Sequence, residues 1–553
     1  MPVHRSLGMH ANAVATRNAG IRLPGGEPDE GELHVRFGEG VQEPRREQRW
    51  RACALLHRSG GQRESDGVVV PLIGVQTNAP GGKGPDFGHA SGAGTRKGMT
   101  GTARSNHPGR PSPVVDLNGL PPVRDNVQRL QRKLWAAAKQ SPERRFHALY
   151  DRIHRVDVLW EAWRRVRTNR GAAGVDKVTL ADVESYGVDR MLRELRQDLE
   201  AGTYRPAPAR RVDIPKPAGG VRPLGIPTVC DRVVQAAAKI VCEPIFEADF
   251  LSCSYGYRPG RSATDAKEAI RVAFPEGFVW AVEFDIADFF GSIDHDVVMG
   301  LVERRISDRR TLKLIRGWLS AGVMVDGRFQ ETVSGTPQGG VISPLLANIV
   351  LHELDRVLVD RNGVFVRYAD DGVVLCRSQA HAEQALALVR DTLAGMGLAL
   401  HADKTKIVDL REGREGFDFL GCHFHARLSG RLWEQRGIRR YYLHRWPSQR
   451  SMKRARARIR ALTGANRCHQ DIREIISLIN PILRGWGNYF RTGNAARKFN
   501  QLDRYVVWRL KRLLIRRYGR NLHAGRADAW TREWFEQHGL HRLRGTVRYP
   551  GAA

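Results

Sequence analysis

Hydrophobic and polar residues change their spacing several times along the chain, and each change predicts a different kind of structure. Residues 125–166 repeat their hydrophobic positions at helical spacing, with arginines on the outer faces and a break near Ser141-Pro142. The glycine-rich stretch Asn169–Leu180 predicts a loop. From about residue 205 to 430, short β-branched strands alternate with helices. The pattern therefore predicts an α+β fold with a helical extension before it.

The first 120 residues follow neither pattern. They hold 21 of the 57 glycines and 10 of the 27 prolines and show no sustained period, which is a composition typical of disorder. The strand-like run Gly67–Val75 has no partner strand in this segment. Two interpretations stay open: a flexible basic tail, or an upstream extension outside the working protein, which would then begin at a later start such as Met99.

The segment FVRYADDGVVL, Phe365–Leu375, places two adjacent carboxylates between two runs of strand formers. A plain hairpin more readily takes Asn-Gly or Asp-Gly at its turn. Asp370 and Asp371 repel each other, so they form either an ordinary acidic turn or a site that holds a cation. Mg²⁺ prefers a few carboxylates plus substrate phosphates, and two-metal phosphoryl transfer needs a further carboxylate from elsewhere in the chain.

The segment Val279–Asp296 supplies a candidate for that further carboxylate. Alternate residues share one face of a predicted strand: Trp280, Val282 and Phe284. Asp285 then lies on the opposite face, at the end of the strand. Asp288 and Asp294 follow in the same segment, where a capping or turn role explains them at least as well. A strand that ends in Asp beside an Asp-Asp hairpin is the metal-holding half of a polymerase palm.

The charge of the chain narrows the class of partner. The formal net charge is +30, and residues 431–553 carry 29 Lys and Arg against 7 Asp and Glu, a net charge of +22. Aromatic residues are interleaved with these cations: Tyr441, Tyr442, Trp446, Trp486, Tyr489, Phe490, Tyr505 and Trp508. Cations mixed with aromatics favour a nucleic-acid surface over a merely solvated face. An anionic membrane surface fits less well, because the chain has no long apolar span or amphipathic anchor.

The seven cysteines form no C-x-x-C pair, which argues against zinc ribbons and a disulfide framework and indicates a reducing compartment. One cluster, Cys422-His423-Phe424-His425, could suggest a metal site. In a strand, however, Cys422 and Phe424 share one face and the two histidines share the other. The cluster therefore favours a half-buried strand over a metal site. The first thirty residues lack the charged and apolar regions of a signal peptide.

Several motifs in one order give the chain a family resemblance over residues 125–553. The motifs are IPKPAGGVRPLGIPTVCDRVVQ (Ile214–Gln235), SYGYRPGRSA (Ser254–Ala263), the Asp285 strand, SGTPQGGVISPLLANIVLHELD (Ser334–Asp355), YADD, HADKTKI (His401–Ile407), FDFLGCHF (Phe417–Phe424) and INPILRGWGNYFR (Ile479–Arg491). With these motifs the chain resembles a bacterial group II intron-encoded protein, a reverse transcriptase with maturase activity. Chance does not explain this many motifs in the same order.

The resemblance implies a right-hand polymerase fold, with fingers and palm followed by a mostly helical thumb and maturase domain. We expect residues 1–120 to be disordered or a non-native upstream extension. We expect a helical N-terminal extension over 121–205, fingers and palm over 206–430, and a thumb and maturase domain over 431–520. Residues 521–553 are expected to be a basic C-terminal tail. The paired cysteines of an endonuclease domain are not found, so we expect no endonuclease activity.

The resemblance also implies the catalytic residues. Asp285, Asp370 and Asp371 are expected to bind two Mg²⁺ ions, with the carbonyl of Ile286 as a further ligand. One ion would activate the primer 3′-hydroxyl, and the other would steady the leaving pyrophosphate. Asp370 is expected to be the stronger ligand of the adjacent pair.

Five further residues are expected to bind the nucleotide. Lys216 and Arg222 flank a Gly-Gly turn, so their cations can reach a triphosphate. Gln338 offers amide hydrogen bonds in a segment that the resemblance places beside the templating base. Phe290 follows Asp285 by five residues and is expected to clash with a 2′-hydroxyl, which selects deoxynucleotides. Lys404 is expected to approach phosphates near the site.

The last motif predicts contacts with RNA. Trp486 and Tyr489 suggest base or ribose contacts, and Arg484 and Arg491 suggest phosphate contacts. Aromatic residues at helical spacing are also common in cores, so a packing role stays open for them.

The expected partners are the intron RNA, a DNA target and primer, and deoxynucleoside triphosphates, with no membrane. The expected location is the bacterial cytoplasm, at the nucleoid when the protein acts on DNA. Two alternatives stay open. One is a maturase that only aids splicing on an inactive polymerase fold, and the other is a domesticated reverse transcriptase of the retron-like or defence-associated kind.

Overall fold

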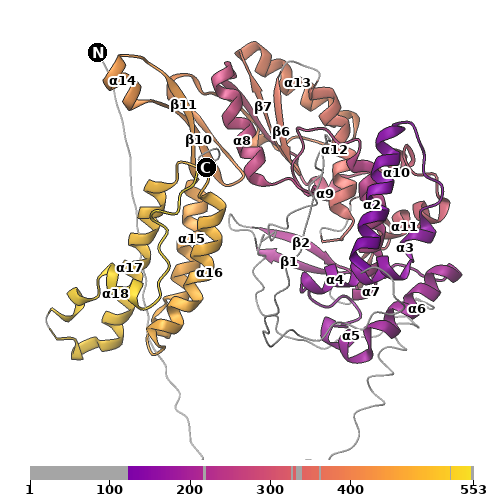
Figure 1. Ribbon diagram of the computed structural model, residues 1–553, viewed down its shortest axis with the longest axis horizontal. Helices are drawn as coiled ribbons and strands as arrows, with labels where there is room; N and C mark the ends of the chain where they lie inside the picture. Colours follow the sequence, from indigo (N-terminus) through magenta and orange to yellow (C-terminus); the bar gives the residue numbers. More distant parts are fainter. Residues whose placement is uncertain are drawn as a thin grey trace, which may run out of the picture. The chain divides into compact units, whose positions relative to one another are not determined.

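A computed structural model describes residues 123–215, 220–325, 328–331, 335, 339–359, 363–523 and 525–549 (Figure 1). Three sequence predictions lie outside these residues. They concern the segment 1–120 with its strand-like run, and the side chains of Lys216 and Gln338. Among the helices in the described ranges, none is long and apolar enough to cross a membrane.

The N-terminal part of the described chain is helical, as predicted. Its helices are α2 (Val123–Gln140), α3 (Tyr150–Ile153), α4 (Val156–Thr168), α5 (Leu180–Tyr186) and α6 (Val188–Ala201). The chain leaves α2 just before Ser141-Pro142, and the predicted glycine-rich loop precedes α5, where Thr179 and Asp182 form a capping box. Helices α2 and α4 pack on α7 (Val229–Glu247), which is buried on nearly all sides and is apolar for that reason.

A first sheet follows these helices, with the strand order β2-β1-β4-β5. Its strands are β1 (Ala209–Pro215), β2 (Val221–Ile226), β4 (Val323–Val325) and β5 (Arg328–Gln330). Strands β1 and β2 form an antiparallel hairpin in which Ile214 pairs with Arg222. The hairpin therefore carries Arg222 near its tip.

The central sheet is antiparallel, with the order β6-β7-β3-β8. Its strands are β3 (Trp280–Asp285), β6 (Val364–Tyr368), β7 (Asp371–Cys376) and β8 (Lys406–Asp409). Helices α8 (Ala263–Ala273) and α12 (Ser343–Val359) contact β6, while α13 (Gln379–Gly395) contacts β3, β7 and β8. Between β3 and β4 lie α9 (Phe289–Ser292), α10 (His295–Glu303) and α11 (Arg309–Leu319). Strands that are covered by helices in this way read as continuous apolar runs.

A third sheet has the order β11-β10-β9. It consists of β9 (Gly416–Phe419), β10 (Cys422–Leu428) and β11 (Tyr441–Pro447), with α14 (Gly430–Arg436) between the last two strands. Cys422 and Phe424 are buried, while His423 and His425 face the half-exposed side, as the strand pattern predicts. The domain boundary expected at residue 430 falls inside this sheet, between two paired strands.

The C-terminal part is helical (Figure 1). Its long helices α15 (Gln449–Leu462), α16 (Ile472–Phe490) and α17 (Ala496–Tyr518) contact one another and share one hydrophobic core with the third sheet. The segment after α17 was expected to be a basic tail, but it is folded. It forms the short helix α18 (Arg532–Gln537) and buries Trp530, Phe535, Leu540 and Leu543 in the same core. Four large apolar side chains in a short segment are enough to dock it on the bundle.

Candidate active site

The two adjacent carboxylates lie at the tip of a tight hairpin, as predicted. Tyr368 at the end of β6 pairs with Asp371 at the start of β7, so Ala369 and Asp370 are the only two turn residues. Ala369 has a φ of 59°, and a positive φ at the first turn position is typical of a type II′ hairpin. Glycine usually takes that position, so the turn is strained and depends on its surroundings.

Asp285 ends β3 directly beside this hairpin. It is the register partner of Asp371 in the antiparallel β3–β7 pair. Directly opposed residues in such a pair have their side chains within a few ångströms of each other. The sheet therefore brings Asp285, Asp370 and Asp371 to one edge, which confirms the juxtaposition that the sequence predicted.

The backbone just after Asp285 directs one carbonyl toward the hairpin. The carbonyl oxygen of Asp285 accepts from the backbone N–H of His401 at 2.8 Å, and Ala287 donates to the carbonyl of Ala399 at 2.8 Å. Hydrogen-bonding directions alternate along an extended chain, so the carbonyl of Ile286 points away from residues 399–401. It lies on the side of β3 that carries β7, where a cation bound by the carboxylates would be.

The carboxylates are electrostatically strained when only protein surrounds them. Burial raises the pKa of Asp371 to about 7, with further contributions from the charges of Asp370 and Asp285. Burial and then the charge of Asp285 also raise the pKa of Asp370. Both shifts mean that ionising these carboxylates costs free energy, because their negative charge is incompletely compensated. A bound divalent cation would remove that cost.

Two cations of the chain partly compensate this charge. The ammonium group of Lys404 forms an ion pair with the carboxylate of Asp285. Arg222 is close enough to lower the pKa of Asp370 by charge attraction. The structure therefore places both predicted residues beside the carboxylates, with Lys404 on a carboxylate oxygen.

The carboxylates and the carbonyl at this edge fit Mg²⁺ better than a metal ion that is coordinated by protein side chains alone. Among the residues that the structure describes, no three His, Cys, Asp or Glu side chains are arranged to hold an ion by themselves. Mg²⁺ is usually bound through one or two carboxylates together with substrate phosphates and water, and needs no such cage. Three carboxylates at an open sheet edge, with raised pKa values at Asp370 and Asp371 and one carbonyl beside them, are consistent with that mode.

Phe290 lies in the short helix α9, five residues after Asp285. Its neighbour Phe289 is buried, as predicted for a core residue, and meets the half-buried Phe290 ring edge to face at 5.3 Å. Gly335 is fixed near this helix, because its backbone N–H donates to the carbonyl of Ile293 at 2.8 Å. Asp294 accepts backbone bonds at the start of α10, which confirms its capping role.

The glycine after Gln338 is fixed beside the β1–β2 hairpin. Gly339 has a φ of 119°, and a Cβ there would lie 2.5 Å from the carbonyl oxygen of Gly225 in β2. Two glycines flank Gln338 in the sequence. Gly335 is held beside Phe290, and Gly339 is held beside the strand of Arg222.

The sequence did not predict the buried charge network that lies under the hairpin. The guanidinium of Arg367 is 1% exposed and donates five hydrogen bonds, as many as it has N–H groups. Its acceptors are Asp355 Oδ1 at 2.6 Å and Oδ2 at 2.6 Å, Asn348 Oδ1 at 3.0 Å, the Ala369 carbonyl at 3.0 Å and Ser254 Oγ at 2.8 Å. Arg367 therefore joins α12 and the Ser254 segment to the carbonyl of the strained turn residue. One signal was available, because an arginine inside an apolar strand run must find a buried partner.

Gly256 supports the same turn from the outside. The segment around it runs beside β6, where Tyr255 donates to the Arg367 carbonyl at 2.8 Å. Asn348 also donates to the carbonyl of Gly256 at 2.9 Å. A Cβ on Gly256 would collide with the backbone nitrogen of Ala369 and would lie 2.9 Å from the carbonyl carbon of Tyr368. No atom beyond hydrogen fits between this segment and the hairpin.

We expect Gly256→Ala to lower nucleotide incorporation at least tenfold, because the hairpin must shift by several tenths of an ångström and the site loses its geometry (about 1.4 kcal/mol per factor of ten). Primer extension under single-turnover conditions measures the effect. Gly300→Ala in α10 is the matched control, since a Cβ there meets nothing within 4 Å. Equal activity of the two variants would show that the contact does not support the hairpin.

The four residues predicted to contact RNA lie on or next to α16, and they differ in environment. Arg484 is exposed, and Arg491 is half-buried. Trp486 is half-buried and packs against the core residue Phe499, with ring centroids 5.4 Å apart. The Tyr489 hydroxyl donates to the carbonyl of Leu420 at 2.9 Å, so it joins α16 to the turn after β9.

The buried side chain of Lys267 also holds Tyr489. Lys267 Nζ lies 4.1 Å from the centre of the Tyr489 ring and donates to the Tyr489 carbonyl at 3.3 Å. Burial lowers the pKa of Lys267. Tyr489 therefore connects the third sheet, α8 and α16.

Two family patterns match the chain. Residues 214–424 match the family described as reverse transcriptase (RNA-dependent DNA polymerase), and residues 452–534 match the group II intron maturase-specific domain. Protein YkfC of Escherichia coli (strain K12) is 36% identical over 354 residues, which cover 56% of this chain and 91% of YkfC. Group II intron-encoded protein LtrA of Lactococcus lactis subsp. cremoris is 38% identical over 239 residues, which cover 43% of this chain and 39% of LtrA.

A chain in a solved structure titled "Partial Cas6-RT-Cas1--Cas2 complex" is 28% identical, with a TM-score of 0.29 over 44% of this chain and 42% of that chain. That superposition is too partial to bear on the fold.

Proposed function

This chain belongs to the group II intron-encoded proteins, a family of metal-dependent RNA-directed DNA polymerases with a maturase domain, and we propose how its own residues perform these activities. It copies its intron RNA into cDNA from a DNA primer, and it binds the same RNA to aid splicing. Such a protein acts in the bacterial cytoplasm, and at the nucleoid when DNA is the target.

One observation carries the proposal: Asp285 pairs with Asp371 in the sheet, and Asp370 lies in the turn between β6 and β7. These three carboxylates and the Ile286 carbonyl are the residues that would hold two Mg²⁺ ions. When bound, the ions would supply Lewis-acid activation of the primer 3′-hydroxyl and stabilisation of the leaving pyrophosphate. The protein contributes a rigid edge on which the carboxylates are already in place.

The β1–β2 hairpin is proposed to bind the triphosphate. Arg222 is near its tip and close to Asp370, and Lys216 follows the last residue of β1 in the sequence. Guanidinium and ammonium groups at this position would offset phosphate charge opposite the carboxylates. Lys404 is proposed to exchange the carboxylate of Asp285 for a substrate phosphate when cations neutralise Asp285.

Sugar selection is proposed to depend on Phe290, because its half-buried ring is in α9, five residues after Asp285. Gln338 is proposed to contact the templating base and incoming nucleotide. The fixed positions of Gly335 and Gly339 on either side of its segment support this role.

Intron RNA is proposed to bind the basic C-terminal quarter of the chain, residues 431–553, and the helical N-terminal extension. Of the four residues predicted on or beside α16, Arg484 and Arg491 are proposed to contact phosphates. Trp486 and Tyr489 are proposed to act through packing, since Trp486 packs against the core and the Tyr489 hydroxyl donates to the carbonyl of Leu420.

The Mg²⁺ concentration that gives half-maximal polymerase activity is expected to fall as pH rises toward neutrality. Asp371 has a pKa raised to about 7, so below that pH a proton must leave before a cation binds, which lowers apparent affinity by up to about tenfold per pH unit. Mg²⁺ titrations of primer extension between about pH 6 and about pH 8 measure the trend. Asp371→Asn should flatten it, and an unchanged slope in that variant would assign the titration to another group.

Primer extension on an RNA template tests the function. The purified chain, an RNA template with an annealed DNA primer, deoxynucleotides and Mg²⁺ should yield full-length cDNA. A parallel splicing assay with a transcript of the surrounding intron should show faster splicing with the protein. Splicing without any cDNA synthesis by the wild-type chain would favour the splicing-only maturase. cDNA synthesis by a chain whose gene lies outside any intron would favour a domesticated reverse transcriptase.

A further inference from the structure

Four arginines converge on one cleft in the C-terminal part of the chain, far from the carboxylates in sequence. The cleft has a volume of about 370 Å³ and is lined by Asn500, Arg504, Arg532, Glu533, Arg542 and Arg544. Helix α17 supplies the first two residues, α18 supplies the next two, and the segment after α18 supplies the last two. We call these four arginines and the space between them the arginine cleft.

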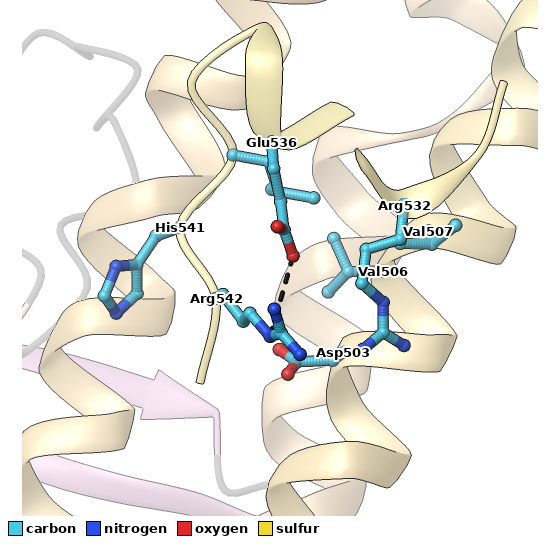
Figure 2. A pocket seen from close by; sticks show the side chains of 8 residues that line it. Asp503, Val506, Val507, Arg532, Glu536, His541 and Arg542 are labelled. Carbon is cyan, nitrogen blue, oxygen red and sulfur yellow. Dashed lines mark ion pairs between the residues drawn. The ribbon is translucent and has the colours of Figure 1, made fainter. Parts of the chain in front are cut away.

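The segment after α18 is held firmly against α17. The carboxylate of Asp503 is 5% exposed and accepts from the backbone N–H groups of Leu543 at 3.1 Å and Arg544 at 3.0 Å. Leu543 between the two arginines is fully buried. Figure 2 shows Asp503 of α17 close to the side chains of Arg532 and Arg542. Arg542 and Arg544 are therefore presented to the cleft by a fixed backbone.

Asn480 fastens the same segment to α16. Its side-chain oxygen accepts from the backbone N–H of His541 at 2.8 Å, and its side-chain amide donates to the carbonyl of Gly539 at 2.8 Å. Side chains from two helices therefore bind the backbone of this segment at Gly539, His541, Leu543 and Arg544.

The charge in the cleft is compensated only in part, because Glu533 is the one acidic residue among the six that line it. Arg542 pairs with Glu536 at 3.7 Å, the pair drawn in Figure 2. Across the described ranges, no carboxylate lies within 4.0 Å of the guanidinium groups of Arg504, Arg532 or Arg544. Arginine side chains that the backbone holds close together repel one another. A bound anion would offset the free-energy cost of this repulsion.

The lining also indicates which kind of anion fits. Every side chain that lines the cleft is polar or charged, so it has no aromatic or apolar surface on which a base could stack. Guanidinium groups match the oxygens of a phosphate in bidentate fashion. Most of the cleft lies within the segment that matches the maturase-specific domain.

We propose that the arginine cleft binds a backbone phosphodiester of the intron RNA, without reading its bases. This inference rests on the proposed function, because it names the site where the RNA partner would be held. A phosphate contact of this kind fixes the register of a nucleic acid on a protein and carries no sequence information.

The test compares two double variants that remove the same charge. Arg504→Gln/Arg544→Gln empties half of the cleft, and it leaves the backbone bond of Arg544 to Asp503 in place. Arg377→Gln/Arg390→Gln removes two exposed arginines next to and within α13 and serves as the control. The probes are an in vitro transcript of the surrounding intron and a short DNA duplex, and binding is measured over a range of salt concentrations.

We expect the cleft variant to bind the transcript about tenfold more weakly at physiological salt. The slope of log affinity against log salt should become less steep by about one to two, since each lost phosphate contact contributes about 0.7 to 0.9. The control should bind like the wild type, and both variants should extend a short primer–template at the wild-type rate and melt at the wild-type temperature.

Three outcomes would overturn the assignment while the wild-type chain still binds the transcript. They are wild-type RNA affinity of the cleft variant, an equal loss in the control, or a loss confined to the DNA duplex. A wild-type chain that neither binds the transcript nor extends a primer would instead overturn the proposed function.

Discussion

Asp370→Asn is expected to lower the rate of nucleotide addition on an RNA template by about a thousandfold or more. The change removes one negative charge from an edge where three carboxylates meet and where burial and the charge of Asp285 already raise the pKa of Asp370. A metal site of this kind supplies several kcal/mol of transition-state stabilisation, and about 4 kcal/mol corresponds to a thousandfold in rate. Single-turnover primer extension with saturating Mg²⁺ measures the loss.

The fold and the RNA affinity should be unaffected by the same change. Asn has almost the shape of Asp, and the tight turn is held by the Ala369 carbonyl, which Arg367 binds at 3.0 Å. Asp391→Asn, an exposed position on α13, is the matched control and should retain full activity. Activity of the Asp370 variant within tenfold of the wild type would refute its assignment as a metal ligand.

Asp355→Asn is expected to lower the free energy of unfolding of the polymerase region by about 3–5 kcal/mol. Asp355 is 0% exposed and Arg367 is 1% exposed, so the change leaves a buried guanidinium without its counter-charge. The Ala369 carbonyl would lose a well-positioned donor at the same time, and the strained turn would relax. Denaturant unfolding followed by circular dichroism measures the first effect, and primer extension below the unfolding transition measures the second.

A double substitution separates stability from positioning. Asp355→Leu/Arg367→Met removes both charges and should recover most of the lost stability, because an apolar pair of similar volume replaces a buried ion pair without loss in other proteins. It cannot recover the bond to Ala369, so we expect its polymerase rate to stay at least tenfold below the wild type. Wild-type activity in the double variant would reduce the network to a stability role.

The edge that carries the three carboxylates could be predicted from the sequence because its signals are local. Two apolar runs around two acids predict a hairpin, and a strand that ends in Asp285 predicts a third carboxylate. Both elements have these bounds in the structure, and the pair of Asp285 with Asp371 follows from the register. The same holds for the alternation along β10, which separates Cys422 from His423.

Other features could not be predicted, since they depend on which distant groups meet. Arg367 was visible as a charge in a strand, but its five acceptors come from three separate segments. Lys404 was expected near phosphates, and the structure places it on Asp285. Trp486 was predicted to contact RNA with a packing role left open, and the structure shows it half-buried against the core.

The sequence alone determined the class of chemistry, the three carboxylates and the polyanionic partner, because spacing along a strand and net charge are properties of the chain itself. Only the tertiary structure decided what holds the hairpin, since a buried charge and a missing Cβ matter through neighbours that are far away in sequence. It also decided that residues after α17 fold, because burying Trp530, Phe535 and Leu543 against the helices outweighs the repulsion of the arginines between them. That packing turns a basic segment into a cleft with four arginines at fixed positions.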